Sequence, residues 1–307
     1  MHRDHAAASR RNLSRGILLM VLAMLLLPGI DAIAKGLSAT LPAGVITWSR
    51  FFFQCLYLLP FVMGTGAFKA GRRLWIDGAR GVLIACATLL FFASLVDLPL
   101  ADAISIFFVE PLILTLLSAT LLGERVGWRR ALAVIIGFCG SLIVIRPSYE
   151  VFGLTALLPM GAALLFAFYM VLTRLQARGG NAISMQFTAG LSGLITMTAA
   201  LWFGRETGLP VLDPLWPTLR EWLLMAALGA IATTGHVLIV HAVRRVGAAM
   251  VAPFQYLEII GATILGLLLF GDFPDATTWL GVTVIIGSGL FVFYRERKLA
   301  GREDADG

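Results

Sequence analysis

The chain has 307 residues, of which 59% are hydrophobic and 14% are charged, and its mean hydropathy is +0.87. A water-soluble core of ordinary proportions cannot bury so large an apolar fraction, so the composition excludes a soluble globular protein and indicates an integral membrane protein. The net charge of +6 would suggest nucleic acid as the partner of a soluble protein, but the positions of the basic residues indicate membrane orientation instead.

Ten apolar segments have the length of roughly 20 residues that a helix needs to cross the hydrocarbon layer. They predict an all-α membrane protein with ten transmembrane helices, at residues 16–38, 42–65, 78–97, 99–122, 127–146, 153–175, 182–203, 220–242, 247–270 and 276–294. The corresponding organisation is a cytoplasmic tail at 1–15, a first five-helix repeat at 16–149, a second at 150–295 and a cytoplasmic tail at 296–307.

Basic residues are distributed unequally between the two sets of loops. Nineteen of the 24 Lys and Arg residues lie on one side of the membrane if the N-terminus is cytoplasmic. The opposite loops hold only Arg146, Arg205 and Arg220, with Lys35 near the end of the first segment. Because cytoplasmic loops carry the excess of Lys and Arg, this asymmetry predicts that both termini are cytoplasmic.

Three charged residues lie within or beside the first two segments. Asp31 and Lys35 are four residues apart, so they share a helix face and can pair; the alternative is a pair at the interface that extends toward water. Arg50 lies well inside the second segment, where a charge costs roughly 2.5 to 3.5 kcal/mol on insertion scales. It therefore needs a partner, for which Asp31 is the nearest candidate in sequence. Structural or gating roles are expected for all three.

A segment that contains a carboxylate occurs twice. Residues 107–124, FFVEPLILTLLSATLLGE, align with residues 255–272, QYLEIIGATILGLLLFGD, and this register sets Glu110 over Glu258. Each copy is an apolar span with one carboxylate inside it and a Gly-acid pair at its end. An ionisable residue inside a membrane span usually marks a substrate or ion path, so the repeat indicates transport. Helical spacing from Glu110 places Ala103, Phe107, Leu114 and Leu117 on its face.

Five spans per repeat is an odd number, so the second repeat must be inverted in the membrane relative to the first. Inverted repeats place the substrate near the bilayer midplane, between the two halves. The same register sets Thr88 over His236, which we interpret either as a hydrogen-bonded packing residue or as a proton carrier. Gln255 and Glu258 are three residues apart and share a face, close to Tyr256.

Several motifs resemble those of one known family. They are Arg50 in the second segment, the run from Glu110-Pro111 to Gly123-Glu124, and its repeat from Glu258 to Gly271-Asp272. Across residues 16–294 the chain resembles the EamA-type branch of the drug/metabolite transporter superfamily. It departs from the family pattern at Ile259, where a Pro is usual, and at Asp272, which replaces Glu.

The resemblance implies a secondary transporter of the bacterial inner membrane, with a cavity lined mainly by the first, third, fourth, sixth, eighth and ninth helices. Glu124 and Asp272 would then be structural caps at helix ends. By the same resemblance, the substrate-binding candidates are Phe107, Glu110, His236, Gln255, Tyr256 and Glu258.

Residues 28–54, which open with PGIDAIAKGL, resemble riboflavin uptake transporters most. The leading hypothesis is therefore riboflavin uptake by alternating access, with Glu110 or Glu258 binding a proton or a cationic part of the substrate. Exporters or exchangers of amino acids, S-adenosylmethionine or drugs are the alternatives. A membrane-embedded enzyme is the alternative of another class, but no catalytic or ATP-binding motif supports it. No cofactor or metal is expected, the partners are a small molecule and the bilayer, and a homodimer is left open.

Overall fold

The computed structural model describes residues 2–65, 74–121, 128–176, 182–246 and 252–306, and within these ranges the protein is helical without strands. Its elements in chain order are α1 (His2–Leu26), α2 (Pro28–Leu37), α3 (Ala43–Thr65), α4 (Leu74–Ser94), α5 (Leu100–Phe107), α6 (Glu110–Leu121), α7 (Trp128–Phe152), η1 (Gly153–Leu157), α8 (Leu158–Gln176), α9 (Ala182–Gly204), η2 (Pro210–Leu212), α10 (Leu219–Val246), η3 (Ala252–Tyr256), α12 (Leu257–Phe270) and α13 (Ala276–Asp306).

Seven helical stretches of the described chain are long and apolar enough to cross a membrane, and three further apolar helices are shorter. Each of the ten predicted segments coincides with one of these stretches. The shorter three are Ile135–Ile145, Phe254–Phe270 and Ala276–Phe291. The predictions of an all-α protein and of several membrane spans are therefore confirmed, while the arrangement as ten spans in two repeats stays a prediction.

Proline residues mark two places where a predicted span is divided into two helices. Pro28 begins α2 directly after Leu27, and Pro111 is the second residue of α6, just after the break at Phe108. Because proline has no backbone N–H, a preceding helix cannot continue its hydrogen bonding through it. A third division lies between the 3-10 helix η3 and α12. Broken backbone at membrane depth is tolerated only inside the protein or along a cavity.

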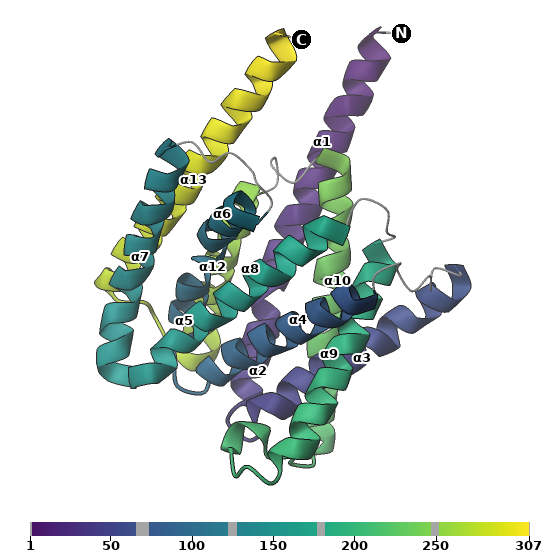
Figure 1. Ribbon diagram of the computed structural model, residues 1–307, viewed down its shortest axis with the longest axis vertical. Helices are drawn as coiled ribbons and strands as arrows, with labels where there is room; N and C mark the ends of the chain where they lie inside the picture. The colour runs from purple at the N-terminus through teal and green to yellow at the C-terminus, as the bar shows by residue number, and fades with distance from the viewer. Residues whose placement is uncertain (1, 66–73, 122–127, 177–181, 247–251, 307) are drawn as a thin grey trace.

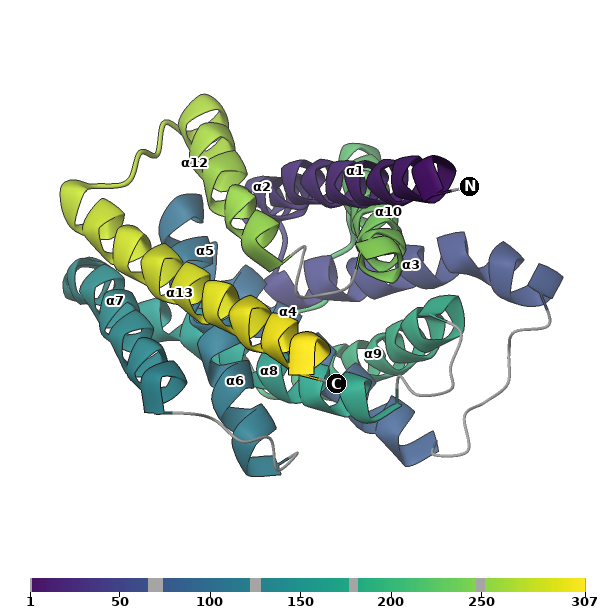
Figure 2. The ribbon, with the colours of Figure 1, turned by 90° about the horizontal axis from the view of Figure 1, so that it is seen from above.

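Helices that are distant in the sequence pack side by side. α1 contacts α10, α4 contacts α8, α3 contacts α9, and α7 contacts α13. The N- and C-terminal ends lie at the same end of the molecule (Figure 1). Figure 2, a view from that end, shows α13 beside α7 and α10 beside α1. The largest apolar cluster joins α2, α4, α5, α10, α12 and α13.

The contact between α7 and α13 depends on glycine. A Cβ on Gly281 would lie 2.7 Å from the carbonyl oxygen of Gly140 and 2.4 Å from Cγ2 of Val144. A Cβ on Gly137 would lie 2.4 Å from Oγ of Ser288 on α13. Small residues therefore let these helix backbones approach closely, as they commonly do between helices in membranes.

Candidate functional site

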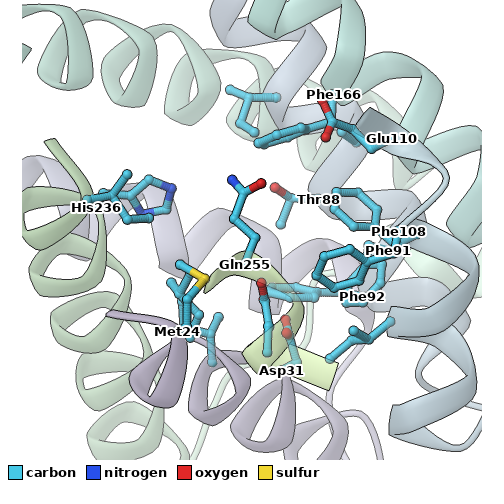
Figure 3. Close-up of a pocket in the computed structure, with 18 of the residues that line it drawn as sticks. Met24, Asp31, Thr88, Phe91, Phe92, Phe108, Glu110, Phe166, His236 and Gln255 are labelled. Atoms are coloured by element: carbon cyan, nitrogen blue, oxygen red, sulfur yellow. The ribbon is translucent and has the colours of Figure 1, made fainter. Parts of the chain in front are cut away.

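A pocket of about 200 Å³ lies between the helices, and its lining combines aromatic with ionisable side chains. The aromatic lining residues are Phe91, Phe92, Phe107, Phe108 and Phe166. The ionisable ones are Asp31, Arg50, Glu110, His236 and Glu258. Figure 3 shows the side-chain amide of Gln255 between His236 and Thr88. Such a mixture of apolar walls with a few polar groups is typical of a small-molecule site.

The lining residues come from every segment that the family resemblance implied. The first predicted span contributes Asp31, the third Thr88, the fourth Glu110, the sixth Phe166, and the eighth and ninth contribute the rest of the polar group. The second span adds Arg50 from α3. The segments in contact with the pocket thus belong to both halves of the chain.

Five of the six expected binding residues line the pocket, and Tyr256 does not. Its ring centroid lies 5.5 Å from that of Phe108, which is a lining residue. Its hydroxyl group occupies the space that a side chain at Gly289 would fill. Tyr256 therefore packs against Phe108 and α13, whereas its neighbours Gln255 and Glu258 line the pocket.

The three carboxyl groups share one local structure. Asp31, Glu110 and Glu258 each lie in the first turn of a helix, namely α2, α6 and α12. Each of these helices begins inside a predicted membrane span, at one of the three breaks. The N-terminal end of a helix carries partial positive charge and therefore stabilises a nearby carboxylate. The breaks thus place acidic groups in the pocket at positions where their negative charge is best tolerated.

Arg50 is buried, with 8% of its surface exposed. Its Nη1 atom donates a hydrogen bond to Oγ1 of Thr88, and its guanidinium carbon lies 5.2 Å from the ring centroid of Phe51. Asp31, the expected partner, interacts with Arg50 electrostatically, but no salt bridge joins the two in the described chain. The Nε atom of Arg50 has no hydrogen-bond partner among the described residues.

Lys35 does not pair with Asp31. Its Nζ atom lies 3.4 Å from Oδ2 of Asp272 and donates a 2.6 Å hydrogen bond to the carbonyl oxygen of Leu98. Asp31 instead faces the pocket, one helical turn before Lys35. Asp272 lies directly after the C-terminal end of α12, where it was expected to cap the helix. Gly271 has φ 73°, and the Asp272 N–H donates a hydrogen bond to the carbonyl oxygen of Gly266, which is typical of a helix C-terminus.

The corresponding cap at Glu124 lies outside the described residues. Its expected role as a helix cap stays a prediction. Among the described residues, the first copy of the repeat includes Glu110, at which α6 begins.

Two pocket residues are held in place by specific contacts. His236 donates from Nδ1 to the carbonyl oxygen of Ala232 at 2.7 Å, because that oxygen can only accept, and its Nε2 atom remains for the pocket. Phe107 lies edge-on to Phe91 and to Phe166, with centroid distances of 5.4 and 5.6 Å. The aromatic wall is therefore a packed cluster that presents flat surfaces to a ligand.

Comparison with known proteins agrees with this geometry. The model of the EamA-like transporter family matches residues 14–146 and again residues 153–294. The chain belongs to the EamA-like transporter family. It is therefore a membrane transporter of the drug/metabolite superfamily, as the motifs around Glu110 and Glu258 indicated.

Curated relatives of this EamA-like chain carry different substrates. It is 30% identical to the S-adenosylmethionine uptake transporter of Rickettsia bellii, over 87% of this chain and 89% of that protein. It is 29% identical to the pseudopaline exporter of Pseudomonas aeruginosa, over 89% and 94%. It is also 29% identical to the riboflavin transporter of Rhizobium johnstonii, over 92% of each. These relatives are all transporters, but they differ in cargo and direction.

A solved structure shares the fold of the EamA-like chain. A protein of known crystal structure superposes with a TM-score of 0.63 at 19% identity, covering 93% of this chain and 99% of that one. At this identity the likeness concerns the fold alone.

Proposed function

We propose that this EamA-like protein is a secondary transporter that carries S-adenosylmethionine by alternating access around the described pocket. The observation that carries the proposal is the charge of the lining, which holds three carboxyl groups, one guanidinium group and an aromatic wall. S-adenosylmethionine has matching parts, because it joins two cationic groups, a sulfonium and an ammonium, to one carboxylate and a flat adenine ring.

Riboflavin, the cargo that the sequence alone favoured, is the second candidate. Its flat ring suits the wall of Phe91, Phe107 and Phe166, and one relative is a riboflavin transporter. However, riboflavin carries no ionic group at neutral pH. It would offer no ionic group to the carboxyl and guanidinium groups of the pocket, whereas a zwitterion offers groups of both signs. This argument favours the zwitterionic cargo.

The contacts between helices support two inverted repeats as the basis of transport. The predicted register makes α4 correspond to α10, α8 to the α1 and α2 pair, and α9 to α3. Each contact of α4 with a helix of the second half should then have a counterpart between α10 and a helix of the first half. The contact of α4 with α8 has its counterpart in that of α10 with α1, and the contact of α4 with α9 in that of α10 with α3. Inverted repeats of this kind transport by rocking about a site between them.

The orientation is proposed from the charge distribution. Both termini lie at one end of the molecule (Figure 1), which agrees with an even number of crossings. Because most Lys and Arg residues belong to the tails and loops assigned to this end, we place it in the cytoplasm, in the inner membrane of a bacterium.

Counterflow in proteoliposomes tests the function without knowledge of direction or coupling ion. Vesicles that contain the purified protein are loaded with unlabelled S-adenosylmethionine and diluted into a trace of the labelled compound. Labelled compound should accumulate transiently, and protein-free vesicles should show no accumulation. If labelled riboflavin accumulates in the same assay and labelled S-adenosylmethionine does not, riboflavin replaces S-adenosylmethionine as the proposed cargo. Growth of a riboflavin auxotroph at low external riboflavin tests the second candidate in cells.

A further inference from the structure

Arg50 is the one lysine or arginine among the described residues that line the pocket. Its side chain is 8% exposed, so its charge is largely removed from water and lipid headgroups. Within the described chain it forms one hydrogen bond, from Nη1 to Thr88, while the Nε atom bonds to nothing. A guanidinium has five N–H donors, and a buried donor without an acceptor is costly. An acceptor is therefore expected in the functioning protein.

Arg80 shows how the same chain accommodates an arginine that serves the fold. It is 1% exposed and does not line the pocket. Its Nη1 atom lies 3.3 Å from Oδ1 of Asp77, and its Nε atom donates a 3.0 Å hydrogen bond to Thr173. A packing arginine in this protein is thus paired with a carboxylate and bonded through Nε. Arg50 has neither contact in the described chain, although Asp31 lines the same pocket.

The surroundings of Arg50 hold its guanidinium group in a fixed orientation. Thr88 binds it through Nη1, and the ring of Phe51 lies 5.2 Å from its central carbon. The group is therefore held in one orientation beside the pocket, ready to bind a planar anion. Carboxylates fit a guanidinium best, because two parallel hydrogen bonds can form between the planar groups.

We propose that Arg50 binds the carboxylate of the amino-acid part of the substrate and thereby selects zwitterionic cargo over purely cationic cargo. The proposal rests on the proposed function, since it assigns one part of S-adenosylmethionine to one residue. The carboxyl groups of Asp31 and Glu258, which interact with each other electrostatically in the same pocket, take the cationic part. Arg50 is then a specificity residue, whereas the sequence had suggested a structural or gating role.

A matched pair of ligands tests the proposal in the unaltered protein. Decarboxylated S-adenosylmethionine keeps the adenine, the sulfonium and the ammonium groups but lacks the carboxylate. The wild-type protein should bind the complete molecule roughly ten- to hundredfold more tightly, measured by calorimetry in detergent, because a charge-assisted bidentate contact is lost. Equal affinities would overturn the role of Arg50 but leave the proposed function standing. If the protein binds neither ligand, the proposed function fails, and this inference fails with it.

Variants assign the discrimination to the residue. In Arg50→Gln the affinity for S-adenosylmethionine should fall to that of the decarboxylated compound, whose own affinity should change less than threefold or so. Arg50→Lys should retain part of the preference, since it keeps the charge without the planar fork. The control Arg80→Gln should lower thermal stability and leave the ratio of the two affinities unchanged. If Arg50→Gln lowers the affinities for both ligands by the same factor, so that their ratio stays that of the wild-type protein, the proposal is overturned. If Arg50→Gln does not fold, Thr88→Val gives the same readout, because it removes the hydroxyl that orients the guanidinium.

Discussion

At the scale of single residues, the acidic groups of the pocket owe their position to interruptions of the backbone. Asp31, Glu110 and Glu258 occupy first turns of helices that start within predicted membrane spans. An acidic residue in the middle of a continuous helix would lack this favourable end of the helix dipole. We therefore expect the charge of these residues, rather than their size, to matter for binding.

The change Glu258→Gln tests this expectation, since it removes the charge and keeps the shape. We expect the apparent KM for S-adenosylmethionine in counterflow to rise about tenfold, because an ionic contact worth roughly 1.5 kcal/mol or more is lost. Asp97→Asn is the control, as Asp97 is exposed in the turn between α4 and α5 and does not line the pocket. An unchanged KM in Glu258→Gln at equal reconstitution would remove this carboxylate from cation binding.

The aromatic wall is expected to recognise the ring of the cargo. Phe166 contacts Phe107 and Tyr169 and lines the pocket from α8 (Figure 3). Phe166→Leu keeps an apolar side chain but removes a stacking surface that is worth about 1 kcal/mol or more per base. Competition by adenosine-containing ligands should weaken about fivefold, measured against labelled S-adenosylmethionine. Phe203→Leu, at an exposed position of α9, should have no effect, and an equal effect in both variants would contradict the assignment.

Some of this site could be predicted from the sequence, because the internal repeat is visible when residues 107–124 are aligned with residues 255–272. The register that pairs Glu110 with Glu258 and Thr88 with His236 identifies four residues that line the pocket. The face drawn from Glu110 was less accurate. Phe107 of that face lines the pocket, but Ala103, Leu114 and Leu117 do not. Phe108, which was not placed on that face, is also a lining residue. A continuous helix was assumed, and the break at Phe108 changes which side chains face the pocket.

At the scale of helices, the close contact of α7 with α13 makes a prediction about stability. Gly281→Ala places a methyl group 2.4 Å from Val144 and 2.7 Å from the backbone oxygen of Gly140, which cannot move aside easily. Overpacking of this kind costs about 1 to 3 kcal/mol, so the temperature of unfolding in detergent should fall. Gly287→Ala on the same helix is the matched control, since nothing lies within 4 Å of its added carbon. Equal unfolding temperatures for the two variants would contradict this contact.

The helices themselves were predictable, because a span of roughly 20 apolar residues leaves few alternatives in a membrane. The break before Glu258 was less certain, since Ile259 stands where the family has a Pro. The chain nevertheless changes from η3 to α12 just before Glu258. The partner of Lys35 could not be predicted, because Asp272 is distant in sequence and the two meet only once the helices have packed. Spacing along one helix suggested Asp31 instead.

At the scale of the whole molecule, the end opposite the termini is tied together by contacts from distant segments. Lys35 at the end of α2 joins Asp272 after α12 and the carbonyl oxygen of Leu98 between α4 and α5. Much of the largest apolar cluster is formed by the same helices. Under the proposed alternating access, this end would open in one state. The tie of Lys35 would then be broken and remade in each cycle.

Removal of the tie should shift the population toward molecules that are open at this end. In a background without native cysteines, spin labels at Ala39 and Phe273, both exposed there, report the separation of the two segments. Because the Lys35 and Asp272 side chains are partly exposed, their pair is worth about 1 kcal/mol or less, so Lys35→Met should raise the fraction with the longer distance up to roughly fivefold. Asp272→Asn should act in the same direction, and Asp97→Asn, at an exposed carboxyl of the same end, should not. An unaltered distance distribution in both charge-removing variants would mean that the pair does not distinguish the two states, and the apolar cluster alone would then have to hold this end closed.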